Sequence, residues 1–114
     1  METPTIVIVT VLICALLGAM GQIFFKMSSA NFSFNPIEMI TNWKFIFGAF
    51  LYATSAILFV WTLKYGNLSI LYPVIATSYI WVTLLSVVLL GESFNSIKWI
   101  GIAMIISGIY IIVK

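Results

Sequence analysis

The sequence from Leu68 to Leu90 reads LSILYPVIATSYIWVTLLSVVLL and contains no charged side chain. A helix needs about 20 mostly apolar residues to cross the roughly 30 Å of hydrocarbon in a bilayer. Because a charged side chain at the bilayer centre is costly, an uncharged interval of this length is typical of a membrane-spanning segment. The stretch therefore predicts a transmembrane helix over residues 68–90.

Lysine and glutamate residues divide the rest of the chain in the same way. Three further intervals of similar character cover about residues 5–25, 44–63 and 97–113. The connections after the second and third intervals are only a few residues long, which predicts antiparallel hairpins between neighbouring helices. We expect an all-α integral membrane protein with a single domain over residues 1–114, a four-transmembrane-helix bundle with short hairpin loops.

The first connection is longer and contains a helix-start signal. Asn35-Pro36-Ile37-Glu38 offers a side-chain acceptor at the cap position, a proline at the first helical position and an acid in the first turn. The signal predicts that helical structure begins here, ahead of the second span. We expect its apolar residues to lie in the membrane interface.

Composition and charge exclude several classes of protein. Of the 114 residues, 63% are hydrophobic and 7% are charged, which is too few charges for the surface of a soluble domain. The net charge of +2, with no basic stripe, offers no nucleic-acid surface. Because the chain has no histidine and one cysteine, Cys14, we expect no metal site, no cofactor and no disulfide within it. Its expected surroundings are the lipid bilayer.

Polar and small residues inside the spans mark where helices meet or where a cavity opens, since lipid gives little hydrophobic drive for helix association. In the third span such residues recur at spacings of four and three, which places them on one face of a continuous helix. They are Tyr72, Ala76, Tyr79, Thr83 and Ser86. This face either lines a substrate cavity or makes interhelical hydrogen bonds. We assign Tyr72, Tyr79 and Thr83 to a substrate path.

In the first span, Gly18, Gln22 and Lys26 follow one another at four-residue steps. We assign Gly18 to helix packing. Gln22 is the most polar residue in the four spans, and it either contacts substrate or hydrogen-bonds to another helix. Lys26, at the membrane surface, either attracts an anion such as a phosphate or snorkels to the interface. Both Gln22 and Lys26 are placed on the substrate path.

The last two spans carry features of bending and packing. Pro73 removes a backbone donor in the third span and predicts a kink, with the tolerance of proline near a helix start as the alternative. The fourth span contains four small residues that let another helix approach closely. They are Gly101, Ala103, Ser107 and Gly108. That neighbouring helix belongs either to the same chain or to a second one.

Several stretches of the chain resemble one family of transporters. They are Leu71–Ala76 with its Tyr-Pro pair, Tyr79–Leu84 with its Trp-Val-Thr sequence, Leu90-Gly91-Glu92, and Lys98–Ile102 followed by Gly108. Together they cover nearly all four spans. The chain resembles the drug/metabolite transporter superfamily, in particular its small four-helix EamA-type members. Within these it is most similar to the subunits proposed to flip undecaprenyl-phosphate-linked aminoarabinose, a likeness that Gly21-Gln22 with Lys26 also carries.

The resemblance implies a multi-pass transporter of a prokaryotic inner membrane, acting on a lipid-linked sugar or an amphipathic metabolite. Four helices are few for enclosing a path, so a homodimer or a heterodimer with a similar subunit is implied. The small multidrug resistance exporters of this superfamily carry an essential glutamate in helix one, where this chain has Gly18. The resemblance therefore favours lipid-linked cargo over proton-coupled drug export.

Two other functions stand beside transport. An accessory or assembly subunit of a larger membrane complex would carry the same small residues on its helices. A membrane enzyme acting on lipid phosphates is disfavoured, because no acid lies inside a predicted span and there is no histidine for general acid–base work. We therefore expect a transporter with no catalytic residue.

Overall fold

The computed structural model describes residues 4–93 and 95–114, and all of the regular secondary structure in them is helical. In chain order the helices are α1 (Thr5–Ser28), the short 3-10 helix η1 (Ser29–Asn31), α2 (Pro36–Thr41), α3 (Trp43–Thr62), α4 (Leu68–Ile75), α5 (Ser78–Leu89) and α6 (Ser96–Val113). Helices satisfy every backbone group internally, as lipid requires. Within the described residues, four stretches are long and apolar enough to cross a membrane, namely α1 with η1, α3, α4 with α5, and α6. The predicted all-α fold with four spans is confirmed, and Phe94, in the third predicted connection, lies outside the described residues.

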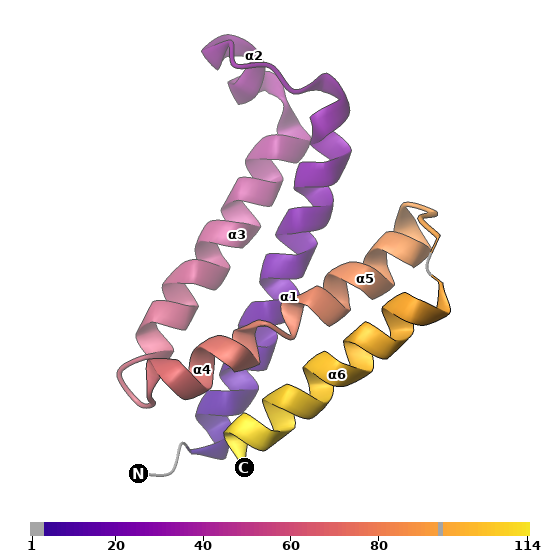
Figure 1. The fold of residues 1–114 in the computed structure, drawn as a ribbon. Helices are drawn as coiled ribbons and strands as arrows, with labels where there is room; N and C mark the ends of the chain where they lie inside the picture. The colour runs from indigo at the N-terminus through magenta and orange to yellow at the C-terminus, as the bar shows by residue number, and fades with distance from the viewer. Residues whose placement is uncertain (1–3, 94) are drawn as a thin grey trace.

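The helices form two hairpins that are tilted against each other (Figure 1). The first consists of α1 and α3, which run antiparallel and make the most extensive contact in the bundle. After it, α4 and α5 cross α1 in turn, and α6 returns alongside them. The molecule is a plate that measures 48 × 37 × 18 Å along its principal axes. The start of α1 and the end of α6 lie at the same edge of this plate (Figure 1).

Small residues set the distance between α1 and α3. A Cβ atom added to Gly21 would lie 2.9 Å from the carbonyl oxygen of Gly48, and one added to Gly48 would lie 3.0 Å from that of Gly21. One turn earlier in α1, a Cβ on Gly18 would lie 3.3 Å from the Ser55 hydroxyl. That hydroxyl donates a 2.7 Å hydrogen bond to the Cys14 carbonyl oxygen. The two backbones therefore touch over these turns, and van der Waals contact and a buried hydrogen bond hold them.

A small apolar core joins the helices near the edge where the chain starts and ends. Val7 and Val11 of α1 pack against Leu71 and Val74 of α4, and all four are buried. Partly buried side chains from the ends of α3 and α6 surround them. This core fixes α4 against α1 and leaves the opposite halves of α3 and α5 to splay apart (Figure 1).

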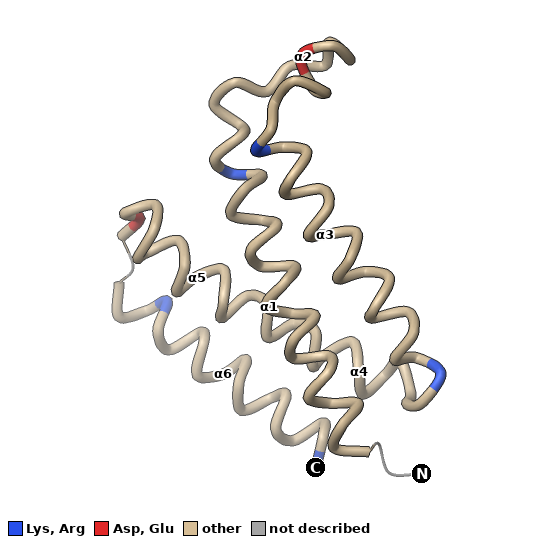
Figure 2. The backbone as a smooth tube through the Cα atoms, turned by 180° about the vertical axis from the view of Figure 1, so that it is seen from behind, with Lys and Arg blue, Asp and Glu red and all other residues tan. Residues whose placement is uncertain are grey.

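Helical structure in the first connection begins where the sequence predicts it, but as a separate helix α2 that ends at Thr41, because Asn42 is extended and caps α3 instead of continuing the helix. Asn35 accepts a 3.0 Å hydrogen bond from the Ile37 amide and caps α2, with Pro36 at its first position. The outward side chains of Ile37 and Ile40 are 73% and 71% exposed, as expected for a helix lying in the membrane interface. Charged side chains lie at helix ends and in connections, and the middles of the spans carry none (Figure 2).

The third span differs from the expectation of one continuous helix over residues 68–90. It is broken between α4 and α5, at Ala76–Thr77. The expectation that its polar residues share one helix face is therefore wrong. The break changes the direction of the chain, so the residues before and after it face different surroundings.

Candidate functional site

The break between α4 and α5 lies near the middle of the third span. Around it, backbone hydrogen bonds join residues three apart, as in a 3-10 helix, instead of four apart. The Thr77 amide donates to the Val74 carbonyl at 3.0 Å, and the Tyr79 amide donates to the Ala76 carbonyl at 3.0 Å. Pro73 lies three residues before the break and cannot donate to the Ser69 carbonyl. Among the described residues, the buried Thr77 hydroxyl has no hydrogen-bond partner, a costly arrangement that stable helices avoid.

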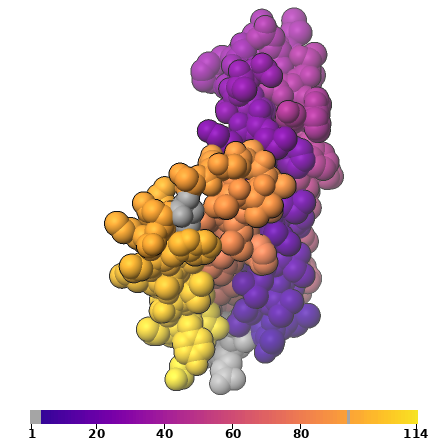
Figure 3. Space-filling view, turned by 90° about the vertical axis from the view of Figure 1, so that its right-hand side faces the viewer, coloured from indigo at the N-terminus to yellow at the C-terminus, as the bar shows by residue number. Residues whose placement is uncertain are grey.

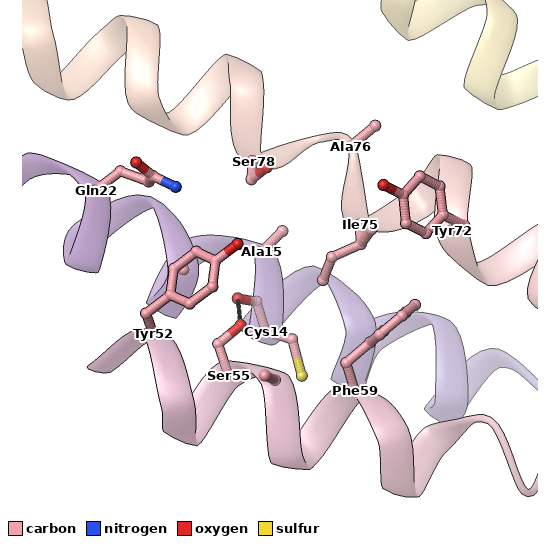
Figure 4. A pocket seen from close by; sticks show the side chains of 12 residues that line it. Cys14, Ala15, Gln22, Tyr52, Ser55, Phe59, Tyr72, Ile75, Ala76 and Ser78 are labelled. Atoms are coloured by element: carbon pink, nitrogen blue, oxygen red, sulfur yellow. Dashed lines mark hydrogen bonds between the residues drawn. The ribbon is translucent and has the colours of Figure 1, made fainter. Parts of the chain in front are cut away.

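A cavity of about 300 Å³ lies between this break and the α1–α3 hairpin. Its polar lining comes from three of the four spans (Figure 4): Gln22 from α1, Tyr52 and Ser55 from α3, Tyr72 from α4 and Ser78 from α5. Apolar side chains, among them Phe59 and Ile75, complete the wall. The cavity thus combines apolar walls with a few placed hydroxyl and amide groups, the arrangement that small-molecule sites use.

The polar groups of this cavity differ in their hydrogen bonds and in their exposure. The Ser55 hydroxyl is buried and donates to the Cys14 carbonyl, as the dashed line in Figure 4 marks, so it offers a ligand only its lone pairs. Gln22 is exposed, and Tyr52 and Tyr72 are 46% and 63% exposed. The cavity is therefore open to one side, where a ligand would meet an amide and two phenols.

The structure divides the residues that the sequence placed on a substrate path. Gln22 and Tyr72 line the central cavity, beside Gly18. Tyr79 and Thr83 line a second cavity, of about 200 Å³, on the side of α5 that faces the start of α6. Thr83 is buried, and its hydroxyl donates a 2.8 Å bond to the Tyr79 carbonyl. Lys26 is exposed in the last turn of α1 and lines neither cavity.

Sequence reasoning missed the contribution of α3 to the central cavity. Gly48, Tyr52 and Ser55 stand four and three residues apart and share one helix face. Small residues at the ends of that series mark the face that meets another helix closely. The series was thus visible in the sequence, but only the contact with α1 shows that Tyr52 lies at the edge of a cavity.

The fourth span stands on the outside of the molecule, beside α5 (Figure 3). Its Ala103 and Ser107 are exposed, and a Cβ added to Gly101 or Gly108 would meet nothing within 4 Å in the described chain. In the described chain, therefore, no other helix lies close against Gly101 or Gly108. Ala103 and Ser107, four residues apart, form an exposed small-residue face of α6 that is open to a second chain, and at about 100° per residue the two glycines lie on a different side of the helix.

Comparison with known proteins agrees with this architecture. The model of the EamA-like transporter family matches residues 1–114. A protein of Pectobacterium atrosepticum, named as a probable 4-amino-4-deoxy-L-arabinose-phosphoundecaprenol flippase subunit ArnE, is 29% identical over 104 residues, which cover 89% of this chain and 92% of that protein. A protein of Shigella flexneri serotype 5b with the same name is 30% identical over 106 residues, or 90% of this chain and 93% of its own length. No solved structure matches. The chain is a small multi-pass membrane transporter, and it belongs to the EamA-like transporter family.

Proposed function

We propose that the protein flips a polyprenyl-phosphate-linked sugar between the leaflets of a bacterial inner membrane. The observation that carries this proposal is the central cavity, which lies within the spans, opens to the side and places a few polar groups among apolar walls. A sugar crossing bare hydrocarbon would lose several hydrogen bonds to water, at a cost of roughly 2–7 kcal/mol for each unpaired polar group. The amide of Gln22 and the phenols of Tyr52 and Tyr72 would replace part of that hydration.

The open side of the cavity suits a substrate with a lipid tail. Its rim is formed by exposed side chains rather than by a closed wall, so the tail of a polyprenyl phosphate would stay in the bilayer while the headgroup enters. The printed name of the relatives states such a cargo for those proteins. Tyr79, Thr83 and Lys26 would then lie on the path outside the central cavity, with Lys26 as an anion contact at the membrane surface.

The proposal includes a dimer, with either a second copy or a similar subunit. A plate 18 Å thick cannot surround a headgroup, and Ala103 and Ser107 give α6 an exposed small-residue face. Helices with small residues at such positions pack closely against a partner in lipid. The same exposed face also favours the second candidate function, an accessory subunit that supports transport by a larger membrane partner.

The test is headgroup flipping by the purified protein in sealed vesicles that contain a polyprenyl-phosphate-linked amino sugar. We expect scrambling above that of empty vesicles, and a rate about tenfold lower for Gln22→Leu, since one hydrogen bond to the crossing headgroup is lost. Thr54→Val, which removes a hydroxyl outside the central cavity, should match the wild type. Absence of flipping by folded protein, alone and with a similar subunit, would rule out the proposal and favour the accessory role.

A further inference from the structure

The second cavity combines hydroxyl groups with charged side chains, and of these two kinds the described lining of the central cavity has only the hydroxyl groups. It lies at the end of the α5–α6 hairpin, and its polar lining consists of Tyr79, Thr83, Ser86, Glu92, Ser93 and Lys98. Its volume of about 200 Å³ corresponds to roughly seven water molecules at about 30 Å³ each, which is space for one sugar-sized group. Within the described residues, the lining of the central cavity includes no charged side chain.

The acid of this cavity, Glu92, and its base, Lys98, lie on two different segments of the backbone. Gly91 has a φ of 70°, a left-handed conformation that reverses the chain after α5. The Glu92 amide consequently donates to the Ser86 carbonyl at 3.2 Å and lies back over the last turn of the helix. Across the cavity, Asn95 caps α6 by accepting a 3.0 Å bond from the Lys98 amide. Glu92 and Lys98 thus border one cavity at the end of two spans, at the level of the membrane interface.

A further cavity, of about 440 Å³, lies at the first connection and also has an acid and a base in its lining. It is lined by Glu38 and Lys44, among others. The Lys44 ammonium lies 5.8 Å from the centre of the Trp43 ring, a favourable cation–π distance. The side chain of Asn42 donates to the Ser28 carbonyl and also accepts from the Phe45 amide. Glu38 and Lys44 therefore supply matched controls for Glu92 and Lys98.

We propose that the second cavity docks the headgroup of a phosphate-linked amino sugar before it enters the central cavity. Glu92 would accept the ammonium group of the sugar, Lys98 would contact the phosphate, and the Tyr79 and Ser93 hydroxyls would face the ring. This inference rests on the proposed function and deepens it, because it gives the two charged groups of the substrate partners that the described lining of the central cavity does not offer. Charge-assisted hydrogen bonds of this kind are the strong ones and give selectivity between headgroups.

The experiment measures binding, separately from flipping. The full chain in lipid nanodiscs is titrated with a short-chain prenyl-phosphate-linked 4-amino sugar and with its 4-hydroxy counterpart. We expect the wild type to prefer the amino compound by about fivefold, as an ion pair worth up to about 1 kcal/mol would give. Glu92→Gln should abolish the preference for the amino compound, and Glu92→Asp should keep it. Lys98→Gln should weaken the binding of both compounds. The controls Glu38→Gln and Lys44→Gln should bind as the wild type does.

Three results would overturn the inference: no binding of either compound by the wild type, an unchanged preference in Glu92→Gln, or an equal loss in Glu38→Gln. The flipping assay with wild-type protein distinguishes a failure of this inference from a failure of the proposed function. Flipping together with an unchanged preference in Glu92→Gln would reject the docking site and retain the flippase. A preference lost in Glu92→Gln without flipping by the wild type would retain the site and reject the flippase.

Discussion

Gly21 and Gly48 show how single residues determine the width of this bundle. Each places a hydrogen atom where any other residue would place carbon about 3 Å from a backbone oxygen of the facing helix. Helix association in lipid depends on such close packing, because burial gains little when the solvent itself is apolar. The same approach brings Tyr52, one turn beyond Gly48, to the edge of the central cavity.

Replacement of Gly48 by alanine should destabilise the protein. The new Cβ would lie 3.0 Å from both the Gly21 carbonyl oxygen and the Phe24 Cβ, so α1 and α3 must separate, at a cost of about 1–3 kcal/mol. Thermal unfolding in detergent measures the loss. The matched control is Gly101→Ala, whose Cβ meets nothing within 4 Å in the described chain. Equal melting temperatures for wild type and Gly48→Ala would contradict the close approach.

At the scale of the element, the third span shows what a sequence pattern leaves undetermined. Its length and lack of charge predicted a membrane crossing, which the structure contains as α4 followed by α5. The break could not be placed in advance. A proline disturbs the turn before it, whereas this break follows Pro73 by three residues. Burial of Leu71 and Val74 against α1 holds α4 in place, so tertiary packing rather than local propensity sets where the chain turns.

Pro73→Ala should therefore leave the break in place. Alanine restores a donor for the Ser69 carbonyl within α4, but the short bonds at the break, such as that from Thr77 to Val74, do not use the nitrogen of residue 73. Hydrogen exchange of the 76–81 segment reports the result, since open backbone exchanges faster than a continuous helix. We expect the same fast exchange in the variant and in the wild type. Slowed exchange in Pro73→Ala would instead make the proline the cause of the break.

At the scale of the whole molecule, the sequence predicted the spans better than their arrangement. Charge spacing is a local property, so the four spans and the cap of α2 by Asn35 could be found from the residues alone. Which helices touch depends on the backbone approach of α1 and α3 and on the tilt of the second hairpin. These contacts placed Gln22 and Tyr72 in one cavity and Tyr79 and Thr83 in another, a division that no spacing in the chain encodes.

The exposed face of α6 yields the last prediction. If a second chain completes the transporter there, Ser107→Leu should weaken the dimer in vesicles by about tenfold, since a large side chain would replace a small one at the contact. The fold of each chain should persist, because Ser107 is exposed and its hydroxyl bonds only within α6, to the Ala103 carbonyl. Single-molecule photobleaching counts the subunits, with Thr54→Leu on α3 as the control. A dimer that survives Ser107→Leu would mean that the chains meet through another face, and the thin plate would then have to close its cavity from the side of α1 and α3.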